Sequence, residues 1–392
     1  MQERLRVKVE PRPTNAKLIL HVFPTFAVGG AQVRFAALAN HFGAEFRHMV
    51  VALDGDLSCA ARLDPRLDVV FPRIDAPKNA MLRNIFRFRA LLREWRPDVM
   101  VTCNWGAIEF ALANARTVTR HIHVVDGFGP EERNTQINRR ILIRRLALAN
   151  ATVVLPSHNL MRIATQIWRL RPETCRYVPN GIDLSRFSQP VGGNPSIGTL
   201  PIGDPPIVDP PIGDKAVPVI GTVAILRPEK NLARLIRAFA MLSAETPCRL
   251  VIVGDGPERS ALEALAASLH VAERVTFTGH RDDIPALYAG FDVFALTSDT
   301  EQMPLSVMEA MASGLPVVAT DVGDIRAMLA PENTPFLAGL DDDAVHGALA
   351  ALLRDRTLRQ QIGAANLATA RRDFDEATMF AAWRDLWLNA GG

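Results

Sequence analysis

The chain has 392 residues, 48% of them hydrophobic and 22% charged, which is the composition of a soluble globular protein and enough chain for two domains. No run of 18 apolar residues occurs, and the first ten residues alternate charged and apolar types, so we expect neither a membrane span nor a secretory leader. The four cysteines are scattered and form no C-x-x-C pair, so we expect reduced cytoplasmic thiols, with no disulfide framework and no zinc site.

The net charge of +2 conceals an asymmetry between the two halves of the chain. Residues 1–190 contain 28 Lys and Arg against 16 Asp and Glu, whereas residues 191–392 contain 16 against 26. Halves of opposite sign indicate two domains with different partners. Two explanations stay open: the basic half faces an anionic surface or substrate, or the halves attract each other across a cleft.

In chain order, the first half alternates strand-like and helix-like segments. Short apolar runs predict strands at 17–22, 49–53, 99–102, 121–125 and 152–155. Helices are predicted at 30–41, which Gly29 and Gly30 open, and at 79–95 and 134–150. This alternation is typical of a parallel sheet with helices on both faces.

A Pro/Gly-rich segment at 189–215 interrupts the alternation. It contains P-I-G-D twice, cannot build a packed helix or sheet, and is predicted to be a linker. We therefore place a first domain at 1–188 and a second at 216–373.

The second half restarts the same alternation. Strands are predicted at 217–223, 250–253, 275–278, 293–296 and 317–319, and helices at 231–244, 257–269, around 286, and at 304–314, 341–355, 357–372 and 376–388. The last helix carries a core-forming stripe that includes Phe380, Trp383 and Trp387. The chain is thus predicted to be α/β, with two doubly wound domains whose ligands bind at the carboxyl edges of the sheets.

The most informative stretch is 300–324, T-E-Q-M-P-L-S-V-M-E-A-M-A-S-G-L-P-V-V-A-T-D-V-G-D. Pro304 suits a helix start and Gly314 a helix end, so Glu301 lies before the helix and Glu309 about a turn and a half inside it. A helix N-terminus favours an anionic or hydroxyl-rich ligand, which the two carboxylates would grip at two points. An amphipathic helix with two solvated glutamates is the alternative.

This string resembles the donor-site motif of the family 4 retaining glycosyltransferases, in which E-x7-E is followed by E-A-M-A-x-G-x-P-V-V-A-T. The resemblance implies the GT-B fold, with two Rossmann-like domains facing a central cleft. It implies that residues 1–188 face the acceptor, that 216–373 bind a nucleotide-sugar donor, and that a last helix at about 374–392 packs back on the first domain.

The resemblance also assigns donor contacts in the second half. Glu309 would hold the ribose hydroxyls, and Glu301, as a catalytic-site residue, would contact the sugar. The backbone of Gln302, Met303, Pro304 and Leu305 would complete that element.

The segment L-R-P-E-K-N at 226–231 resembles the family loop G-R-L-x-P-E-K-G, whose Arg and Lys bind the diphosphate. Lys230 matches in register, but Ile225 stands at the family's Arg. Arg227 would reach the phosphate from two positions along, or else it is a solvated surface residue. An Arg is not trivially replaced, because its guanidinium binds phosphate through two parallel hydrogen bonds.

Other loops match the family as well. Gly29 and Gly30 would let the first loop approach donor or acceptor, or form a simple turn. Gly254, in V-G-D-G-P, and the pair His280 and Arg281 would line the nucleotide.

H-I-H-V-V-D-G-F-G-P-E-E at 121–132 would supply acceptor contacts, and Asp126 falls where the family often has a histidine. Asp126 would act catalytically, by positioning the acceptor or stabilising oxocarbenium charge; a turn-forming Asp-Gly is the alternative.

The implied reaction has retaining stereochemistry, with the leaving phosphate able to take the acceptor's proton, so no protein nucleophile is obligatory. We expect no metal cofactor: Asp54-Gly55-Asp56 mimics a D-x-D metal motif, but lies in the first domain and reads as a loop. The expected partners are a nucleotide-sugar donor and a glycan or lipid-diphosphate acceptor, with no nucleic acid.

Two arginine-rich segments of the first domain, 82–93 and 139–146, combine Arg with Leu, Ile and Phe. They would lie on an anionic membrane at the cytoplasmic face, or they are ordinary half-buried helices.

Two other functions compete with glycosyl transfer. A sugar-nucleotide epimerase of the same fold would convert the donor without acceptor, and the E-x7-E string argues against it. An inactive homologue that serves as a binding or scaffold subunit is supported by Ile225 and Asp126.

Overall fold

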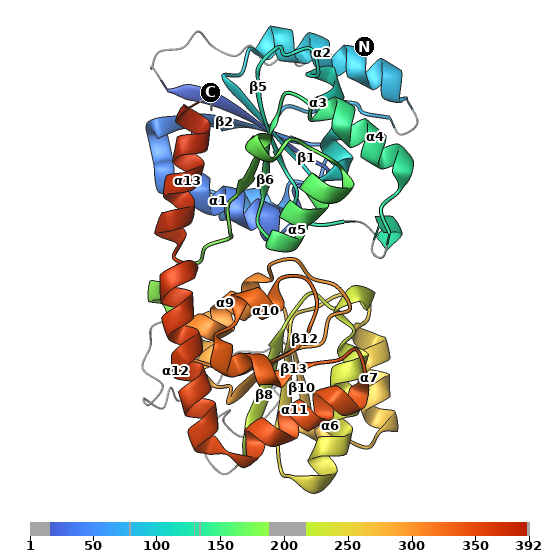
Figure 1. Cartoon of the computed structure of the whole chain (residues 1–392), viewed down its shortest axis with the longest axis vertical. Coiled ribbons are helices and arrows are strands. Elements are labelled where there is room, and N and C mark those ends of the chain that lie inside the picture. The colour runs from blue at the N-terminus through green and yellow to red at the C-terminus, as the bar shows by residue number, and fades with distance from the viewer. Residues whose placement is uncertain (1–15, 78–79, 129, 133–134, 188–216, 390–392) are drawn as a thin grey trace. The chain divides into compact units, whose positions relative to one another are not determined.

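The computed structural model describes residues 16–77, 80–128, 130–132, 135–187 and 217–389 (Figure 1). The chain forms two compact units, one of Met1–Asn180 with Ala377–Gly392 and one of Gly181–Glu376. The boundary falls between Asn180 and Gly181, ahead of the predicted linker, which lies outside the described residues. The predicted starts of the helices at 79 and 134 lie outside them as well.

The first unit is built on a seven-stranded parallel sheet of order β3-β2-β1-β4-β5-β6-β7. The strands are β1 (Lys17–Phe23), β2 (Phe46–Ala52), β3 (Val69–Val70), β4 (Val99–Cys103), β5 (Arg120–Val124), β6 (Thr152–Leu155) and β7 (Cys175–Tyr177). Central strands of such a sheet are covered on both faces, which explains their nearly continuous apolar sequences.

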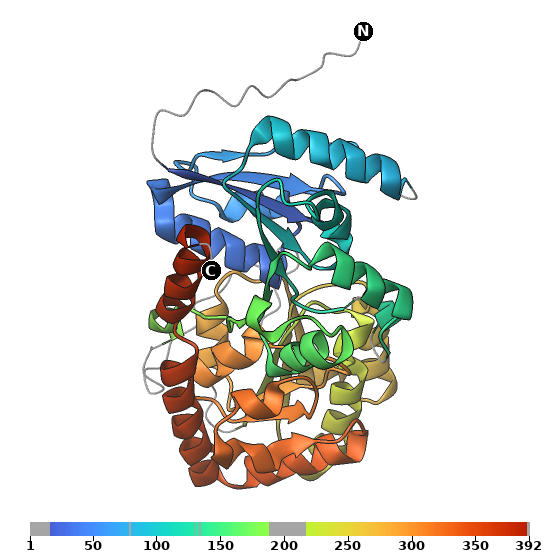
Figure 2. The same ribbon diagram turned by 45° about the horizontal axis from the view of Figure 1, so that its top comes forward.

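Helices cover both faces of this sheet (Figures 1 and 2). They are α1 (Gly30–Phe42), α2 (Met81–Trp95), α3 (Ile108–Ala113), α4 (Asn138–Ala147), α5 (His158–Arg162), which runs on into a π-helical turn at Ile163–Ile167, and α13 (Glu376–Leu388). Successive side chains of a strand point to opposite faces. Accordingly Ile19 and Phe23 of β1 pack in the core with α1 and α13, whereas Leu20 packs with α2 and α3.

The second unit holds a six-stranded parallel sheet of order β10-β9-β8-β11-β12-β13. The strands are β8 (Val219–Val223), β9 (Arg249–Val253), β10 (Val275–Gly279), β11 (Val293–Leu296), β12 (Val317–Thr320) and β13 (Leu337–Ala338). The helices are α6 (Leu232–Glu245), α7 (Arg259–Ser268), α8 (Ile284–Ala289), α9 (Leu305–Ala312), α10 (Ile325–Met328), α11 (Asp342–Arg354) and α12 (Arg356–Asp373). One core lies against α6, α7 and α11, and the other against α8, α9 and α12.

The predicted α/β class with two doubly wound units is confirmed by the two helix-covered parallel sheets. Strands β6 and β11 and helix α13 have the predicted bounds. The prediction missed the strands β3, β7 and β13, which have two or three residues, and the helices α3, α5 and α10, which have four to six and are too short to show a helical period. Among the described residues, no helix is both long and apolar enough to cross a membrane.

Candidate active site

The loops at the carboxyl ends of β8, β9, β11 and β12 converge in the second unit. In a parallel sheet this edge is where ligands bind. Three backbone hydrogen bonds from N–H to C=O join the loops: Leu226 to Asp255 at 3.0 Å, Asp299 to Glu229 at 2.9 Å and Asp324 to Gln302 at 3.1 Å. The predicted donor residues of this unit therefore belong to one connected layer of loops.

Two glycines allow these loops to lie so close together. Gly254 has φ +126°, and a Cβ there would lie 1.9 Å from the Ala224 carbonyl oxygen. Gly323 has φ +61°, and a Cβ there would lie 2.1 Å from the Glu301 carbonyl oxygen. Both positions therefore require glycine, both for its backbone conformation and for the missing side chain. Gly254 was singled out from the sequence as a ligand contact, and Gly323 was missed.

The site's central feature is an ion pair between Lys230 and Glu301, which are 71 positions apart. Lys230 Nζ lies 2.5 Å from Glu301 Oε1, and Ser298 Oγ donates to the same oxygen at 2.7 Å. The Glu301 side chain is 9% exposed and that of Lys230 is 24% exposed, so the pair is largely shielded from water. The structure thus joins two residues that the sequence assigned to different parts of a donor, and adds Ser298, which was missed.

A buried network supports this pair from the side of α6. Arg234 donates to the Thr297 carbonyl at 2.7 Å and to Asp299 Oδ1 at 2.8 Å. Asn231, in the left-handed conformation, caps the start of α6 and donates to Asp299 Oδ1 at 3.0 Å. The network fixes the loop with Lys230 against the loop with Glu301. Only the cap Asn231 had a recognisable local signal.

Ile225 and Arg227 are both exposed at the edge of this layer. The Arg227 N–H donates to the Ile225 carbonyl at 2.8 Å, which makes the loop turn sharply between them. No ion pair to Arg227 is found within the described residues. Its charge is thus available to an anion, whereas Ile225 brings an apolar side chain where the family has an Arg.

Helix α9 begins one residue later than predicted. Pro304 is its N-cap, with an extended backbone at φ −69° and ψ 125°, and no side chain caps this end. Met303 and Pro304 are buried, Leu305 opens the helix, and the helix ends at Ala312. An uncapped first turn has unpaired N–H groups and partial positive charge, which suits an anionic or hydroxyl-bearing ligand.

Glu309 lies inside α9 with a buried aromatic partner. Tyr288 Oη lies 3.0 Å from Glu309 Oε2 and 2.9 Å from the Ser306 carbonyl oxygen. Burial raises the pKa of Glu309, against the opposing effects of the Tyr288 hydrogen bond and nearby Arg186. Since a tyrosine hydroxyl has one hydrogen to donate, Glu309 keeps acceptor capacity for ligand hydroxyls. Tyr288 has no local sequence pattern that would have predicted this contact.

In the loop after β10, the predicted Arg281 is paired with a neighbouring carboxylate. Arg281 makes two hydrogen bonds to Asp283, at 2.7 and 2.5 Å, so its guanidinium is already engaged. His280 is exposed and lies 3.7 Å from Asp282. The Gly279 carbonyl accepts from the Gly254 N–H at 2.9 Å, which joins this loop to the layer.

The remaining predicted residues lie in the first unit. Gly29 caps the start of α1 with an extended backbone, and Gly30 is its first residue. Gln32 Nε2 donates to the Thr25 carbonyl at 2.9 Å, which closes the loop onto the helix that follows it. These glycines therefore lie at a helix N-terminus that follows the first strand, as predicted from their place in the sequence.

Asp126 is fully engaged by Arg34, a buried residue of α1 that sequence analysis missed. The guanidinium contacts both carboxylate oxygens, at 2.6 and 3.0 Å, and donates to Asn180 Oδ1 at 2.7 Å. Burial would lower the pKa of Arg34, but the charge and the hydrogen bonds of Asp126 together outweigh it and the pKa is raised. The Asp126 carboxylate is therefore paired with a buried cation of the same unit.

Asn104 follows β4 and adjoins Asp126. Its Oδ1 accepts from the Asp126 N–H at 2.8 Å, and its own N–H donates to the Val124 carbonyl at 2.8 Å. Its backbone, at φ 57° and ψ −176°, is one that non-glycine residues rarely adopt. Such strain persists only where the surroundings enforce it and is concentrated at functional sites.

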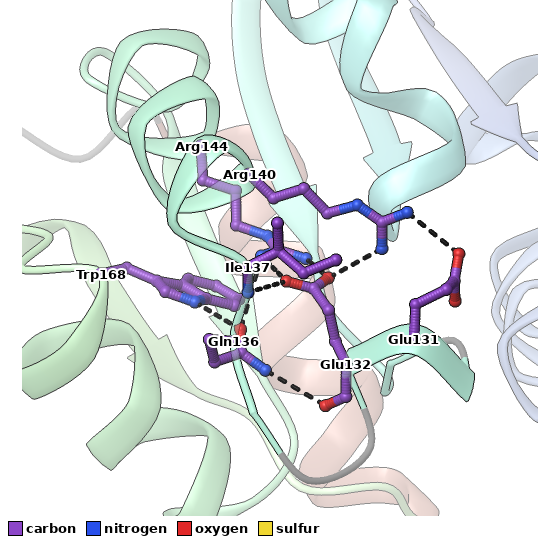
Figure 3. Close-up of polar contacts among 7 residues, drawn as sticks. All are labelled: Glu131, Glu132, Gln136, Ile137, Arg140, Arg144 and Trp168. Carbon is purple, nitrogen blue, oxygen red and sulfur yellow. Dashed lines mark hydrogen bonds and ion pairs between the residues drawn. The ribbon is translucent and has the colours of Figure 1, made fainter.

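The loop between β5 and α4 is anchored by a buried ion-pair cluster (Figure 3). Glu132 accepts from Arg144 at 2.8 and 2.6 Å and from Arg140 at 3.1 Å. The Arg144 guanidinium lies over the rings of Trp168, at 4.5 Å, and Trp105, at 5.0 Å. Burial would raise the pKa of Glu132, but the arginines outweigh it and the pKa is lowered. These arginines thus face the interior of the unit.

The Asp54-Gly55-Asp56 segment forms a turn. Asp54 Oδ1 accepts from the Asp56 N–H at 3.0 Å, and Asp56 Oδ1 accepts from the Ser58 N–H at 2.8 Å. Within the described ranges, no three His, Cys, Asp or Glu side chains are grouped so that they could hold a metal ion.

Comparison with known families matches both halves of the chain. A model described as Glycosyltransferase Family 4 matches residues 28–186, and one described as Glycosyl transferases group 1 matches residues 211–368. The chain is 33% identical over 142 residues to an N-acetyl-alpha-D-glucosaminyl L-malate synthase of Bacillus anthracis, and 38% identical over 143 residues to a GDP-mannose-dependent alpha-mannosyltransferase of Mycolicibacterium smegmatis. These matches cover 36% of this chain and 37% and 36% of the two relatives' own lengths.

Solved structures resemble the chain over nearly its whole length. A glycosyltransferase from Rickettsia africae has a TM-score of 0.77 at 16% identity, covering 95% of this chain and 98% of that one. Anabaena Alr3699/HepE, solved in complex with UDP-glucose, has a TM-score of 0.76 at 20% identity, covering 94% and 99%. At these identities the likeness establishes the fold, which is GT-B.

Proposed function

The chain belongs to family 4 of the glycosyltransferases, and on that premise we propose that it moves a hexose from a nucleotide-sugar donor to a glycan or lipid-linked acceptor. The observation that carries the proposal is the pair of Lys230 and Glu301 just before the uncapped start of α9, with Glu309 further along that helix. A relative named for its dependence on GDP-mannose and a neighbour holding UDP-glucose support the choice of donor.

The second unit would bind the donor. Lys230 and Arg227 supply positive charge for the diphosphate, whose negative charge grows as it leaves. The N–H groups at the start of α9 add donors to the same region. Glu309, with acceptor capacity beyond its Tyr288 contact, would take the ribose hydroxyls, and Glu301 those of the sugar.

The stereochemistry we propose is retention. The acceptor hydroxyl attacks the anomeric carbon on the face from which the diphosphate departs, a new C–O bond forms as the bond to phosphate breaks, and a phosphate oxygen takes the proton. No protein nucleophile and no metal take part.

We further propose that the reaction takes place in the cytoplasm and serves the synthesis of cell-surface polysaccharide.

A calorimetric titration of the full chain with UDP, GDP and ADP and their common sugar conjugates tests the donor site. We expect one nucleotide to bind, Glu309→Ala to abolish its binding, and Leu340→Ser, at an exposed leucine of the second unit that has no predicted ligand contact, to leave it unchanged. Turnover of the matching conjugate should then survive EDTA. Loss of turnover on chelation would refute the metal-independent mechanism.

A second candidate, a nucleotide-binding scaffold without turnover, is favoured by two observations. Ile225 removes a cation from the phosphate loop, and Asp126 is neutralised by Arg34. Binding of one nucleotide without product formation from any acceptor would support the scaffold. Failure of every nucleotide to bind folded protein would overturn the donor site itself.

We further propose that the first unit contacts an anionic membrane. Exposed apolar residues lie one turn apart on each of two helices, and their exposed fractions are 73% and 74% for Leu82 and Phe86 of α2, and 57% and 60% for Leu142 and Leu146 of α4. Exposed arginines accompany them on the same helices, namely Arg83, Arg87, Arg93, Arg139 and Arg145. An apolar face flanked by arginines is the composition of an interfacial helix.

Vesicle co-sedimentation tests this contact. Vesicles of phosphatidylcholine with phosphatidylglycerol should bind the protein, and pure phosphatidylcholine should bind it less. The double variant Leu82→Ser, Phe86→Ser should lose binding, whereas Leu340→Ser, a control at an exposed leucine of the second unit, should retain it. Binding that is independent of anionic lipid would exclude the proposed contact.

A further inference from the structure

We infer that Glu301, by holding Lys230, makes the donor site discriminate a nucleotide-sugar from the corresponding free nucleoside diphosphate. The inference rests on the proposed function, because it takes the Lys230 region as the diphosphate site. It adds a specificity role for the ion pair and a positioning role for Ser298.

One oxygen of the Glu301 carboxylate accepts both hydrogen bonds that hold this side chain. Glu301 Oε1 accepts both from Lys230 Nζ, at 2.5 Å, and from Ser298 Oγ, at 2.7 Å. Ser298 is fully buried two residues after β11, and Thr320 of the adjacent strand β12 donates to its carbonyl at 2.5 Å. Ser298 therefore holds the carboxylate at a fixed place whether or not Lys230 stays bound to it.

The local charges show what a free diphosphate would meet. Lys230 is neutralised by Glu301, Ile225 contributes no charge, and Arg227 is exposed to solvent, where its attraction is weakened. A diphosphate that draws Lys230 toward itself leaves the shielded Glu301 carboxylate with its Ser298 hydrogen bond but without a counter-charge, next to further negative charge. Both effects oppose the binding of a nucleotide without a sugar.

A sugar on the diphosphate removes this opposition. An ionised carboxylate only accepts hydrogen bonds, and sugar hydroxyls donate them. When Lys230 turns to the phosphate, the hydroxyls replace it at Glu301, so that both charged groups keep partners. The same carboxylate then disfavours the free nucleotide that remains after transfer, which promotes product release.

The test compares binding of UDP with UDP-glucose, and of GDP with GDP-mannose, by calorimetry on the full chain. For the nucleotide that binds, Glu301→Gln should tighten binding of the free diphosphate about tenfold while binding of the sugar conjugate does not tighten. Ser298→Ala should also reduce the preference for the sugar conjugate over the free diphosphate, by a smaller factor than Glu301→Gln. Glu301→Gln that weakens both ligands equally would overturn the inference.

A double-mutant cycle with Lys230→Met provides a second readout. Because the tightening depends on freeing Lys230, Glu301→Gln should have no such effect in the Lys230→Met background. An unchanged tightening there would show that Glu301 acts by another route, and it would also overturn the inference. Failure of the unsubstituted chain to bind any nucleotide would instead refute the proposed function, so the two failures are distinguishable.

Discussion

The two units share a parallel-sheet design but place their ionisable groups differently. In the first unit, four histidines, His21, His48, His121 and His123, lie buried on the strands themselves. The described strands of the second unit contain no histidine, and two of its shielded ion pairs, Lys230 with Glu301 and Arg234 with Asp299, lie in the loops at the carboxyl edge. The first unit thus buries titratable groups on its strands, whereas the second has shielded ion pairs where a ligand would bind.

The buried histidines form two small networks. His21 and His48 are 3.2 Å apart, and Thr102 Oγ1 joins His121 Nε2 at 2.8 Å to His123 Nδ1 at 2.7 Å. Burial lowers the pKa of all four, to about 4 for His48 and about 3 for His121. They are therefore neutral in the folded protein at neutral pH.

The largest effect that we expect to distinguish the two units is a loss of stability of the first unit at acidic pH. The histidines have a lower pKa folded than unfolded, so below about pH 6.5 the unfolded state binds more protons and stability falls as the pH falls. Each buried histidine lowers the free energy of unfolding by about 1.4 kcal/mol for every unit by which the pH falls, until the pH reaches its folded pKa. Glu309 has the opposite effect on the free energy of unfolding. Its pKa is raised in the folded protein, so stability rises as the pH falls through that pKa.

Tryptophan fluorescence can follow the first unit alone, because all five tryptophans belong to it. Thermal unfolding monitored this way should shift to lower temperature between pH 7.5 and 5, while calorimetry shows a smaller shift for the second unit. His280→Gln, at an exposed histidine of the second unit, is the control and should change neither transition. Equal shifts of both units would contradict the comparison.

The next effect concerns the ion-pair cluster of the first unit. Arg144→Met should destabilise it by about 3–5 kcal/mol, since Glu132 would remain buried without its main partner. Arg145→Met, at the exposed neighbouring position, is the matched control and should change stability by less than about 0.5 kcal/mol. Denaturant unfolding followed by tryptophan fluorescence measures both. Rescue by adding Glu132→Gln to Arg144→Met would verify the cause, and similar effects of the two arginine substitutions would disprove it.

A smaller effect is expected from the glycines of the second unit. Gly323→Ala would place a Cβ against the Glu301 carbonyl oxygen, so we expect nucleotide-sugar affinity to fall more than about tenfold, which is 1.4 kcal/mol. Gly347→Ala, inside α11 with open space around it, should stabilise the unit by about 0.5–1 kcal/mol. Calorimetric titration and thermal unfolding measure the two. Unchanged affinity in Gly323→Ala would show that the approach of the loops does not shape the site.

The smallest expected effect comes from the phosphate loop. Ile225→Arg restores the family's cation, and we expect diphosphate affinity to rise about fivefold, or roughly 1 kcal/mol. Ile225→Met, of similar size and without charge, is the control for the same titration. If both variants bind alike, the departure at this position carries no electrostatic penalty.

Much of the fold followed from local pattern. Apolar runs predicted the central strands of both sheets, because strands that are covered on both faces cannot carry exposed polar residues. The donor segment was recognisable because its carboxylates, proline and glycine lie within one strand–helix–strand unit. The short edge elements escaped prediction, since β3, β7 and β13 have too few residues to show a period.

The sequence by itself determined the α/β class and the family, and it predicted most of the residues proposed to line the donor site. Only the tertiary structure decided which charges meet: Lys230 with Glu301, Arg34 with Asp126, and Arg144 with Glu132. The physical reason is that the apolar pattern of a helix or strand depends only on which of its own side chains face the core, and this can be read along the sequence. An ion pair between distant residues depends instead on how separate loops are brought together, and no local pattern records that distance.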